Sequence, residues 1–507
     1  MKFLKLLLLI ILILFFSACQ HSDLPALTPS LHSSDTSIPP SPTETALPPS
    51  ATVTQPPAII TATPPPPPAL DLASQYVISA TLDYGWRFLT VEQEIRYPNT
   101  ASEVISELTL VVQPNWRPNV FKLTRFTWDD GTPVEDYTLD IIQLRVPLPE
   151  PLQPGETLEI ALAYELQLPP ILTSEDWGPN PFGYTSRQIN LTDWYPFVPP
   201  YIEGEGWLVH NPWYYGEHLV YPVADFEVSI QISNAPSGTL IAASALDESQ
   251  GDLHQYRLEK ARNFVWSVSP EYRVFQDQVG DVRVFGYAFP YDVTAGEAAF
   301  KVTVKSLELY QELFSPYPFD AMTMVQADFD HGMEYSGLYF LSKAFYNTYD
   351  GTASTYLVAI AAHETAHQWW YGLVGNDQAL EPWLDEALCT YTEKLFYENL
   401  YPDSLDWWWD VRVYWYEPAG WVDSTIYNTA GYRPYRDAVY LNGAIFLDEL
   451  RTLVGDEAFF AFLKDYVRRE TNQLDTAEDF FSILREHSAA EWRSLLEKYF
   501  ENPDISE

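Results

Sequence analysis

The 507-residue chain is poor in cysteine and in basic residues, and each scarcity excludes a class of protein. Two cysteines, Cys19 and Cys389, cannot build a disulfide framework, so we expect no disulfide-stapled fold. Only 28 lysines and arginines stand against 70 acidic residues, which gives a formal net charge of −42. Because phosphate binding needs clustered cations, this balance argues against nucleic acid as a partner. The charge indicates a strongly solvated acidic surface and identifies no substrate by itself.

The apolar run from Leu6 to Phe16 follows two lysines and is shorter than the roughly 20 residues that a membrane-spanning helix requires. A charged start, a short apolar run and small residues before Cys19 are typical of a secretory signal. Ser17-Ala18-Cys19 resembles the lipobox of bacterial lipoproteins, in which the cysteine is lipidated, although Phe16 replaces the usual leucine. We therefore expect residues 1–19 to be a lipoprotein-type signal peptide. Ordinary signal cleavage and an uncleaved anchor are the alternatives, and each implies export.

Residues 20–70 consist mainly of Pro, Ser, Thr and Ala, a composition that cannot bury a core. This composition predicts a disordered linker with polyproline II stretches. At about 3.1 Å per residue, such a linker can hold a folded domain on the order of 100 Å from a membrane. Together with a lipid anchor at Cys19, it predicts a membrane-anchored lipoprotein facing the periplasm or the cell exterior.

Two regions of different periodicity follow the linker. Residues 71–290 contain short alternating strands such as 91–95, 107–112, 158–162 and 226–230, which predict an antiparallel β-sandwich-like domain. Residues 291–507 show helical periodicity at 295–313, 444–453, 457–469, 477–486 and 490–501, with a strand-like run at 322–327. We therefore predict an α+β multidomain chain.

The H-E-x-x-H pattern at His363–His367 is the best candidate for a chemical site. On a helix, residues four apart lie on one face, so both histidines can bind one metal ion, and Glu364 can face a water at that metal. The alternative is two surface histidines on an ordinary amphipathic helix. Small and apolar flanking residues instead predict a helix buried nearly all round. Buried histidines and a buried glutamate need a partner, and a metal is the simplest one.

Imidazole ligands suit zinc, and a catalytic zinc typically takes three protein ligands and a water. Glu386, nineteen residues after His367, is the best candidate for the third ligand, on a second helix packed against the first. Cys389 fits a small buried hydrophobe better than a fourth ligand. Glu393 either orients a ligand histidine or is a surface acid.

From about Tyr76 to its end, the chain resembles the gluzincin aminopeptidases of the aminopeptidase N group. The H-E-x-x-H pattern followed by Glu386 is similar to that family's metal motif, and Gly332-Met333-Glu334 is similar to its exopeptidase motif. The segment from Tyr440 to Ala444 is similar to its tyrosine-containing helix start. The resemblance implies a saddle-like β domain followed by a thermolysin-like, mainly helical catalytic domain, in a short form without the C-terminal helical-repeat domain.

The resemblance also implies one zinc ion per chain, bound by His363, His367 and Glu386, with Glu364 as the general base. The implied reaction is removal of N-terminal residues from peptides that have a free N-terminus. The alternatives are a thermolysin-like endopeptidase on the same site and a catalytically inactive, zinc-containing surface binding protein.

Two further roles follow from matched positions. Glu334 is implied to bind the α-amine of the substrate, and Tyr440 is implied to donate a hydrogen bond to the oxyanion of the transition state, with Tyr435 as the fallback. His331 and Tyr335 flank the exopeptidase motif where the family commonly has Gly and Asn, which is a departure in the amine pocket.

Overall fold

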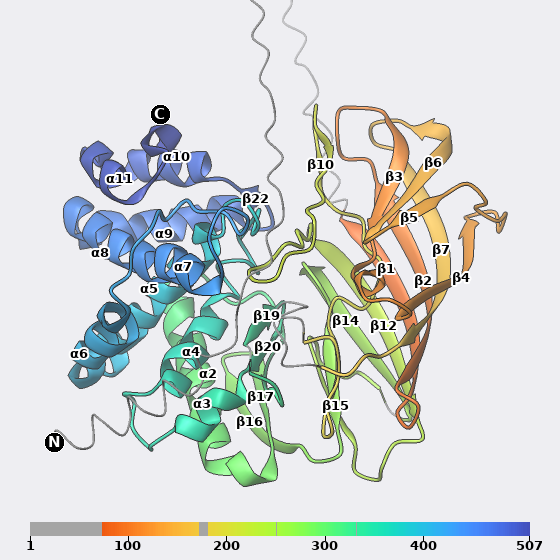
Figure 1. Cartoon of the computed structure of the whole chain (residues 1–507), viewed down its shortest axis with the longest axis horizontal. Helices are drawn as coiled ribbons and strands as arrows, with labels where there is room; N and C mark the ends of the chain where they lie inside the picture. The colour runs from red at the N-terminus through yellow and green to blue at the C-terminus, as the bar shows by residue number, and fades with distance from the viewer. Residues whose placement is uncertain (1–72, 172–180, 250, 331, 507) are drawn as a thin grey trace, which may run out of the picture. The chain divides into compact units, whose positions relative to one another are not determined.

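The computed structural model describes residues 73–171, 181–249, 251–330 and 332–506 (Figure 1). The predicted leader 1–19, its Cys19, the linker 20–70 and His331 lie outside the described residues, so the statements about them stay predictions. Within the described ranges, no helix combines the length and the apolar character that crossing a membrane requires. Residues 70–507 form one compact unit, which holds both the strand-rich and the helical regions.

A six-stranded sheet forms the N-terminal region. Its spatial order is β14 (Leu253–Ala261), β12 (Ala224–Ser233), β1 (Ser74–Asp83), β2 (Phe88–Pro98), β7 (Thr157–Gln167) and β4 (Phe121–Trp128). In β1, alternate residues are buried from Ser74 to Leu82 while Val77 is 45% exposed, as expected when a strand covers a core with one face. Most neighbours in this sheet pair antiparallel, as predicted, but β1 and β12 pair in parallel. The sheet is therefore mixed.

Smaller sheets complete this region. A three-stranded sheet has the order β3 (Ile105–Val111), β6 (Gln143–Leu152) and β5 (Thr138–Asp140). A four-stranded sheet has the order β13 (Leu240–Ala243), β15 (Trp266–Ser269), β9 (Ile189–Leu191) and β8 (Gly183–Tyr184), and β10 (Tyr201–Ile202) pairs with β11 (Gly206–Trp207). All four residues of β15 are buried.

A five-stranded sheet supports the helical region. Its order is β16 (Arg273–Val279), β17 (Val282–Ala288), β18 (Ala321–Gln326), β20 (Leu338–Leu341) and β19 (Met333–Tyr335). The predicted run 322–327 corresponds to β18, whose residues are all buried. The predicted boundary at residue 290 falls after β16 and β17, yet β17 pairs with β18 beyond that boundary, and β16 pairs with β17. Hydrogen bonding therefore joins residues 273–288 to the sheet of the helical region.

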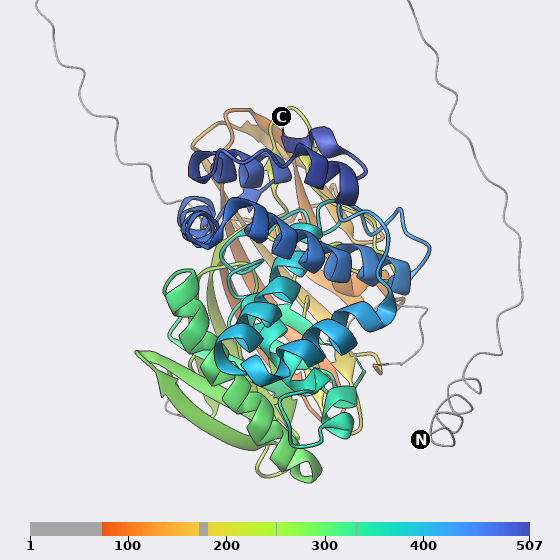
Figure 2. The same cartoon turned by 90° about the vertical axis from the view of Figure 1, so that its left-hand side faces the viewer.

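One helix connects β17 to β18 and the others follow the sheet along the chain; most of them lie in front of the strands in Figure 2. They are α2 (Val293–Leu313), α3 (Lys343–Thr348), α4 (Tyr356–Ala366), α5 (Trp383–Leu400), α6 (Leu405–Trp407), α7 (Tyr432–Arg436), α8 (Gly443–Val454), α9 (Asp456–Glu470), α10 (Ala477–His487) and α11 (Arg493–Tyr499). A short strand, β21 (Gly375–Asn376), pairs with β22 (Leu474–Asp475) between them. The α+β prediction is confirmed, and the helix predicted at 490–501 is shorter, beginning only after Trp492.

Candidate metal-dependent active site

Helix α4 places the first two predicted ligands, and α5 places the third. His363 lies in the last turn of α4, and His367 follows at its C-terminal cap. Glu386 lies in the first turn of α5, where the positive end of the helix dipole stabilises a carboxylate. Helix α4 packs against both α2 and α5, which explains why nearly all of its side chains are buried. The prediction of a helix buried nearly all round is therefore confirmed.

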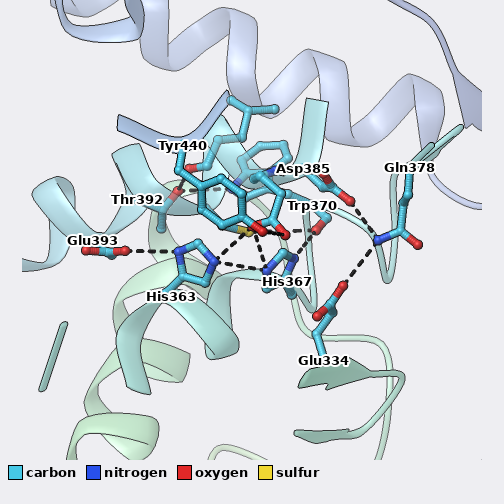
Figure 3. A network of polar contacts seen from close by, with 12 residues as sticks. Glu334, His363, His367, Trp370, Gln378, Asp385, Thr392, Glu393 and Tyr440 are labelled. Carbon is cyan, nitrogen blue, oxygen red and sulfur yellow. Dashed lines mark hydrogen bonds and ion pairs between the residues drawn. The ribbon is translucent and has the colours of Figure 1, made fainter. Parts of the chain in front are cut away.

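The three side chains converge on one point, and Figure 3 shows the two histidines there side by side. One Glu386 oxygen lies 3.1 Å from Nε2 of His363 and 3.5 Å from Nε2 of His367. The two Nε2 atoms lie 3.1 Å apart. One ligand atom from each residue lies within 4.8 Å of the others, and all three residues are buried. Two imidazole nitrogens and one carboxylate oxygen are the donor set of many catalytic zinc sites, so these residues fit that ion.

Charge is concentrated at this point. Burial opposes the charged form of His363, but hydrogen bonds to Glu386 and Glu393 outweigh it and raise the pKa of His363 to about 9. Burial likewise favours a neutral Glu386, but hydrogen bonds from His363 and His367 outweigh it and lower the pKa of Glu386 to about 2. The arrangement therefore favours an ionised Glu386 at neutral pH, and a carboxylate must be ionised to bind a cation.

Glu364 lies beside the three ligands with a free acceptor. It is 6% exposed, and its Oε2 has no hydrogen-bond partner among the described residues. The backbone at Gly332 lies close to the Glu364 carboxylate, because a Cβ added at Gly332 would lie only 2.5 Å from the other Glu364 oxygen. Burial raises the pKa of Glu364 to about 8. A carboxylate with a pKa near neutrality and an unused oxygen is suited to accept and return a proton.

Glu393 contacts the Nδ1 side of the His363 ring, while Nε2 of that ring faces Glu386 and His367. Its Oε1 lies 3.0 Å from Nδ1 of His363, and it accepts hydrogen bonds from Arg412 and from the indole of Trp408. The structure therefore supports the orienting alternative for Glu393, which is fully buried, over the surface acid. Arg412 and Trp408 carried no sequence signal, because they come from the segment after α5 and reach Glu393 only through the fold.

Glu334 lies on the edge strand β19 and faces the same centre (Figure 3). It is 5% exposed, and the Gln378 amide donates to its Oε1 at 3.2 Å and to Asp385 at 2.8 Å.

Sequence reasoning missed Glu217, which follows β11. Glu217, Glu334 and Glu386 each place a carboxylate oxygen within 4.8 Å of the others. One Glu217 oxygen has no hydrogen-bond partner among the described residues.

Three acids in one place repel one another unless a cation lies among them. Burial, followed by the neighbouring carboxylates, raises the pKa of Glu217 well above its ordinary value. Burial also raises the pKa of Glu334. The geometry therefore provides a second place for positive charge beside the metal ligands.

Tyr440, rather than the fallback Tyr435, contacts the metal-ligand side chains. The Tyr440 hydroxyl donates to Oε1 of Glu386, and its ring stacks on His363 with centroids 6.0 Å apart. Tyr440 lies in the π-helical turn Asp437–Asn442 that precedes α8, rather than at a regular helix start. Tyr435 is fully buried and packs against the Tyr440 ring. Cys389 is fully buried, and burial raises the pKa of its thiol, as is typical of a small buried hydrophobe.

Two histidines and a glutamate from adjacent helices, with an unpaired glutamate on the first helix, define the class of metal-dependent hydrolases with a thermolysin-like site. The comparisons agree with that class. Residues 298–499 match the model of the "Peptidase family M1 domain". This match covers the part of the chain that carries the metal-ligand cluster, and it agrees with the resemblance to the aminopeptidase N group.

Relatives and solved structures extend the likeness. The chain is 28% identical over 225 residues to Aminopeptidase M1-A of Oryza sativa subsp. japonica, covering 40% of this chain and 25% of the relative. It is 27% identical over 240 residues to Aminopeptidase M1 of Arabidopsis thaliana, covering 44% of this chain and 27% of the relative. The chain thus spans about a quarter of the length of these curated relatives. The fold is similar to the M1 zinc metallopeptidase from Deinococcus radiodurans, with a TM-score of 0.61 and 22% identity, covering 85% of this chain and 94% of that one.

Proposed function

We propose that the protein is a zinc-dependent aminopeptidase that hydrolyses the N-terminal residue from peptides. One observation supports this above all others: three buried metal-ligand side chains lie next to a second group of carboxylates that needs a cation. A peptide with a free N-terminus supplies that cation on the carbon atom next to its first carbonyl. An endopeptidase has no use for such an acidic group, because an internal peptide bond has no ammonium beside it.

His363, His367 and Glu386 hold the zinc ion in this proposal. The chemistry that zinc supplies when bound is polarisation of a carbonyl and acidification of water. Glu364 takes the proton from the attacking water through its unpaired oxygen and then delivers it to the leaving amine. The Tyr440 hydroxyl is available to stabilise the oxyanion that develops on the carbonyl.

Glu334 and Glu217 bind the substrate ammonium together. The Gln378 amide holds one Glu334 oxygen by a hydrogen bond, which fixes the carboxylate in place. An N-acetylated substrate offers no positive charge, so it would leave both acids unpaired. Leaving two buried carboxylates unpaired costs binding free energy, and selectivity for free N-termini follows from that cost. Sites built to bind a polar group reject analogues that lack the group.

The test compares aminoacyl anilides with their N-acetyl forms, using zinc-loaded protein. We expect cleavage of the free forms only, loss of activity on treatment with a chelator and recovery when zinc is restored. Glu334→Gln should reduce the ratio of the cleavage rates of free and acetylated substrates. Glu312→Gln, at an exposed position on α2, should leave this ratio unchanged. Equal cleavage of free and acetylated substrates by the native protein would refute the aminopeptidase assignment.

We further infer that the protein is exported and anchored to a membrane by lipid on Cys19. The charged start, the short apolar run and the small residues before Cys19 support this, and the proline-rich residues 20–70 suit a tether. In a bacterial host, labelled fatty acid should enter the native protein but not Cys19→Ala. Equal labelling of both proteins would contradict lipidation at this residue.

A further inference from the structure

A pocket opens beside Glu334, between the N-terminal sheets and the helical region. Trp116, Trp213, Met333 and Tyr371 contribute apolar and aromatic surface, while Asp193 and Glu217 contribute carboxylates. Glu334 itself lies on the boundary between this pocket and the metal ligands. A side chain attached to the same carbon as the substrate ammonium therefore has this pocket next to it.

The pocket is acidic and has no cation of its own. None of its lining residues is a lysine or an arginine. His218 lines it, but burial lowers the pKa of this imidazole to about 3, so His218 is neutral at physiological pH. Its Nε2 lies 3.2 Å from the side-chain oxygen of Gln113, which fits a neutral ring that donates one hydrogen bond. The side chains that line the pocket therefore supply negative charge and no positive charge.

Asp193 is held in this pocket by the fold. Its backbone adopts the left-handed region with φ 49°, a conformation that aspartate and asparagine tolerate better than most residues. The Tyr221 hydroxyl donates to its Oδ1 at 2.8 Å. Burial raises the pKa of Asp193 to about 6, so the protein alone leaves this carboxylate poorly stabilised. A ligand cation would stabilise it.

We propose that the pocket beside Glu334 binds a basic side chain, arginine or lysine, on the first residue of the substrate, with Asp193 as its counter-ion. The proposal rests on the aminopeptidase function proposed above. Glu217 and Glu334 lie with Glu386 and take the α-ammonium, which leaves Asp193 for a second positive charge. Trp116 and Trp213 also line the pocket, and aromatic rings favour the apolar stem and the charged end of such a side chain.

The sharpest test uses two substrates that differ in charge and hardly in shape. Arginine and citrulline side chains have nearly the same length and planar end, but only arginine is a cation. The native zinc-loaded protein should cleave arginyl-anilide with a kcat/KM about 10- to 100-fold above that of citrullyl-anilide, the range of a charge-assisted hydrogen bond. Asp193→Asn, which keeps the shape and suits the left-handed backbone, should reduce this ratio to near one.

Asp281→Asn is the matched control, because Asp281 is exposed in the turn between β16 and β17 and should leave the ratio unchanged. Calorimetric titration with free L-arginine and L-citrulline gives a second reading, in which only the native protein and the control should prefer arginine. A ratio near one in the native protein, a ratio that survives in Asp193→Asn, or a preference for acidic first residues would overturn the proposal. A panel of leucyl-, arginyl- and citrullyl-anilide separates the two levels: cleavage of none of the three refutes the aminopeptidase function, whereas cleavage with equal arginine and citrulline rates refutes only the basic pocket.

Discussion

Replacing Glu393 with glutamine should weaken zinc binding although Glu393 is not a ligand. Its two oxygens face four donors: His363 Nδ1 at 3.0 Å, two Arg412 nitrogens at 2.7 and 3.0 Å and the Trp408 indole at 2.8 Å. By accepting from Nδ1, the carboxylate keeps the Nε2 lone pair of His363 directed at the metal. A glutamine amide has only one acceptor oxygen. Its NH2 group would therefore face some of these four donors, with which it cannot form a hydrogen bond.

Two costs follow from this geometry. Loss of a carboxylate that orients a ligand histidine typically weakens metal binding by about 10- to 100-fold, which corresponds to about 1.4–2.7 kcal/mol. In addition, replacing the fully buried Glu393 removes the ion-pair partner of the buried Arg412. Such a change typically costs about 3–5 kcal/mol of folding free energy. The variant should therefore be both less stable and weaker in zinc affinity.

Zinc affinity is measured by competition with a chromophoric chelator, and stability by urea denaturation of the metal-free protein. Glu398→Gln is the matched control, because Glu398 lies on the same helix and pairs with Arg451 at 2.9 Å without touching a histidine. The control should lose some stability but keep its zinc affinity. If Glu393→Gln binds zinc as tightly as the native protein, Glu393 does not orient the ligand, and the reasoning fails.

Three further predictions concern single side chains. Glu364→Gln should lower kcat by about 10²–10⁴-fold with zinc still bound, as judged by metal analysis; retained activity would remove Glu364 as the base. Tyr440→Phe should lower kcat by about 10²–10³-fold with little change in KM, whereas an unchanged kcat would leave the oxyanion without this donor. Burial raises the pKa of Asp475, which is 2% exposed, from 3.8 to about 8, so the folded state holds this proton more tightly than the unfolded state. The stability of the metal-free protein should thus fall by up to about 1.4 kcal/mol per pH unit between roughly pH 4 and 8. Asp475→Asn should remove this slope in urea denaturation, and an equal slope in both proteins would contradict the assignment.

The metal-ligand cluster could be predicted from the sequence because its parts lie close together along the chain. His363 and His367 share a helix face by spacing alone, and a short connection brings Glu386 onto the next helix. The buried character of α4 was equally visible, since almost every flanking residue is small or apolar. Local periodicity also predicted α2 and α8–α10 closely, because each of them buries one side against the core.

The rest of the site depends on contacts between distant segments. Glu217 reaches Glu334 and Glu386 from a loop with no periodic pattern, and Asp193 enters the pocket from another such loop. Arg412 gave no signal because a single arginine after a tryptophan-rich run is ordinary in sequence. The parallel pairing of β1 with β12 likewise joins strands about 150 residues apart, as their register shows. Alternation predicts that a strand exists but does not specify its neighbour.

The order in which peptide bonds are cleaved tests the central claim most directly. A peptide of about ten residues with a free N-terminus, incubated with the zinc-loaded protein, is followed by mass spectrometry over time. The proposed site predicts a ladder of products that shorten one residue at a time from the N-terminus, because Glu334 and Glu217 hold the ammonium beside the metal ligands. Early fragments from internal cleavage, or an identical pattern from the N-acetylated peptide, would contradict it.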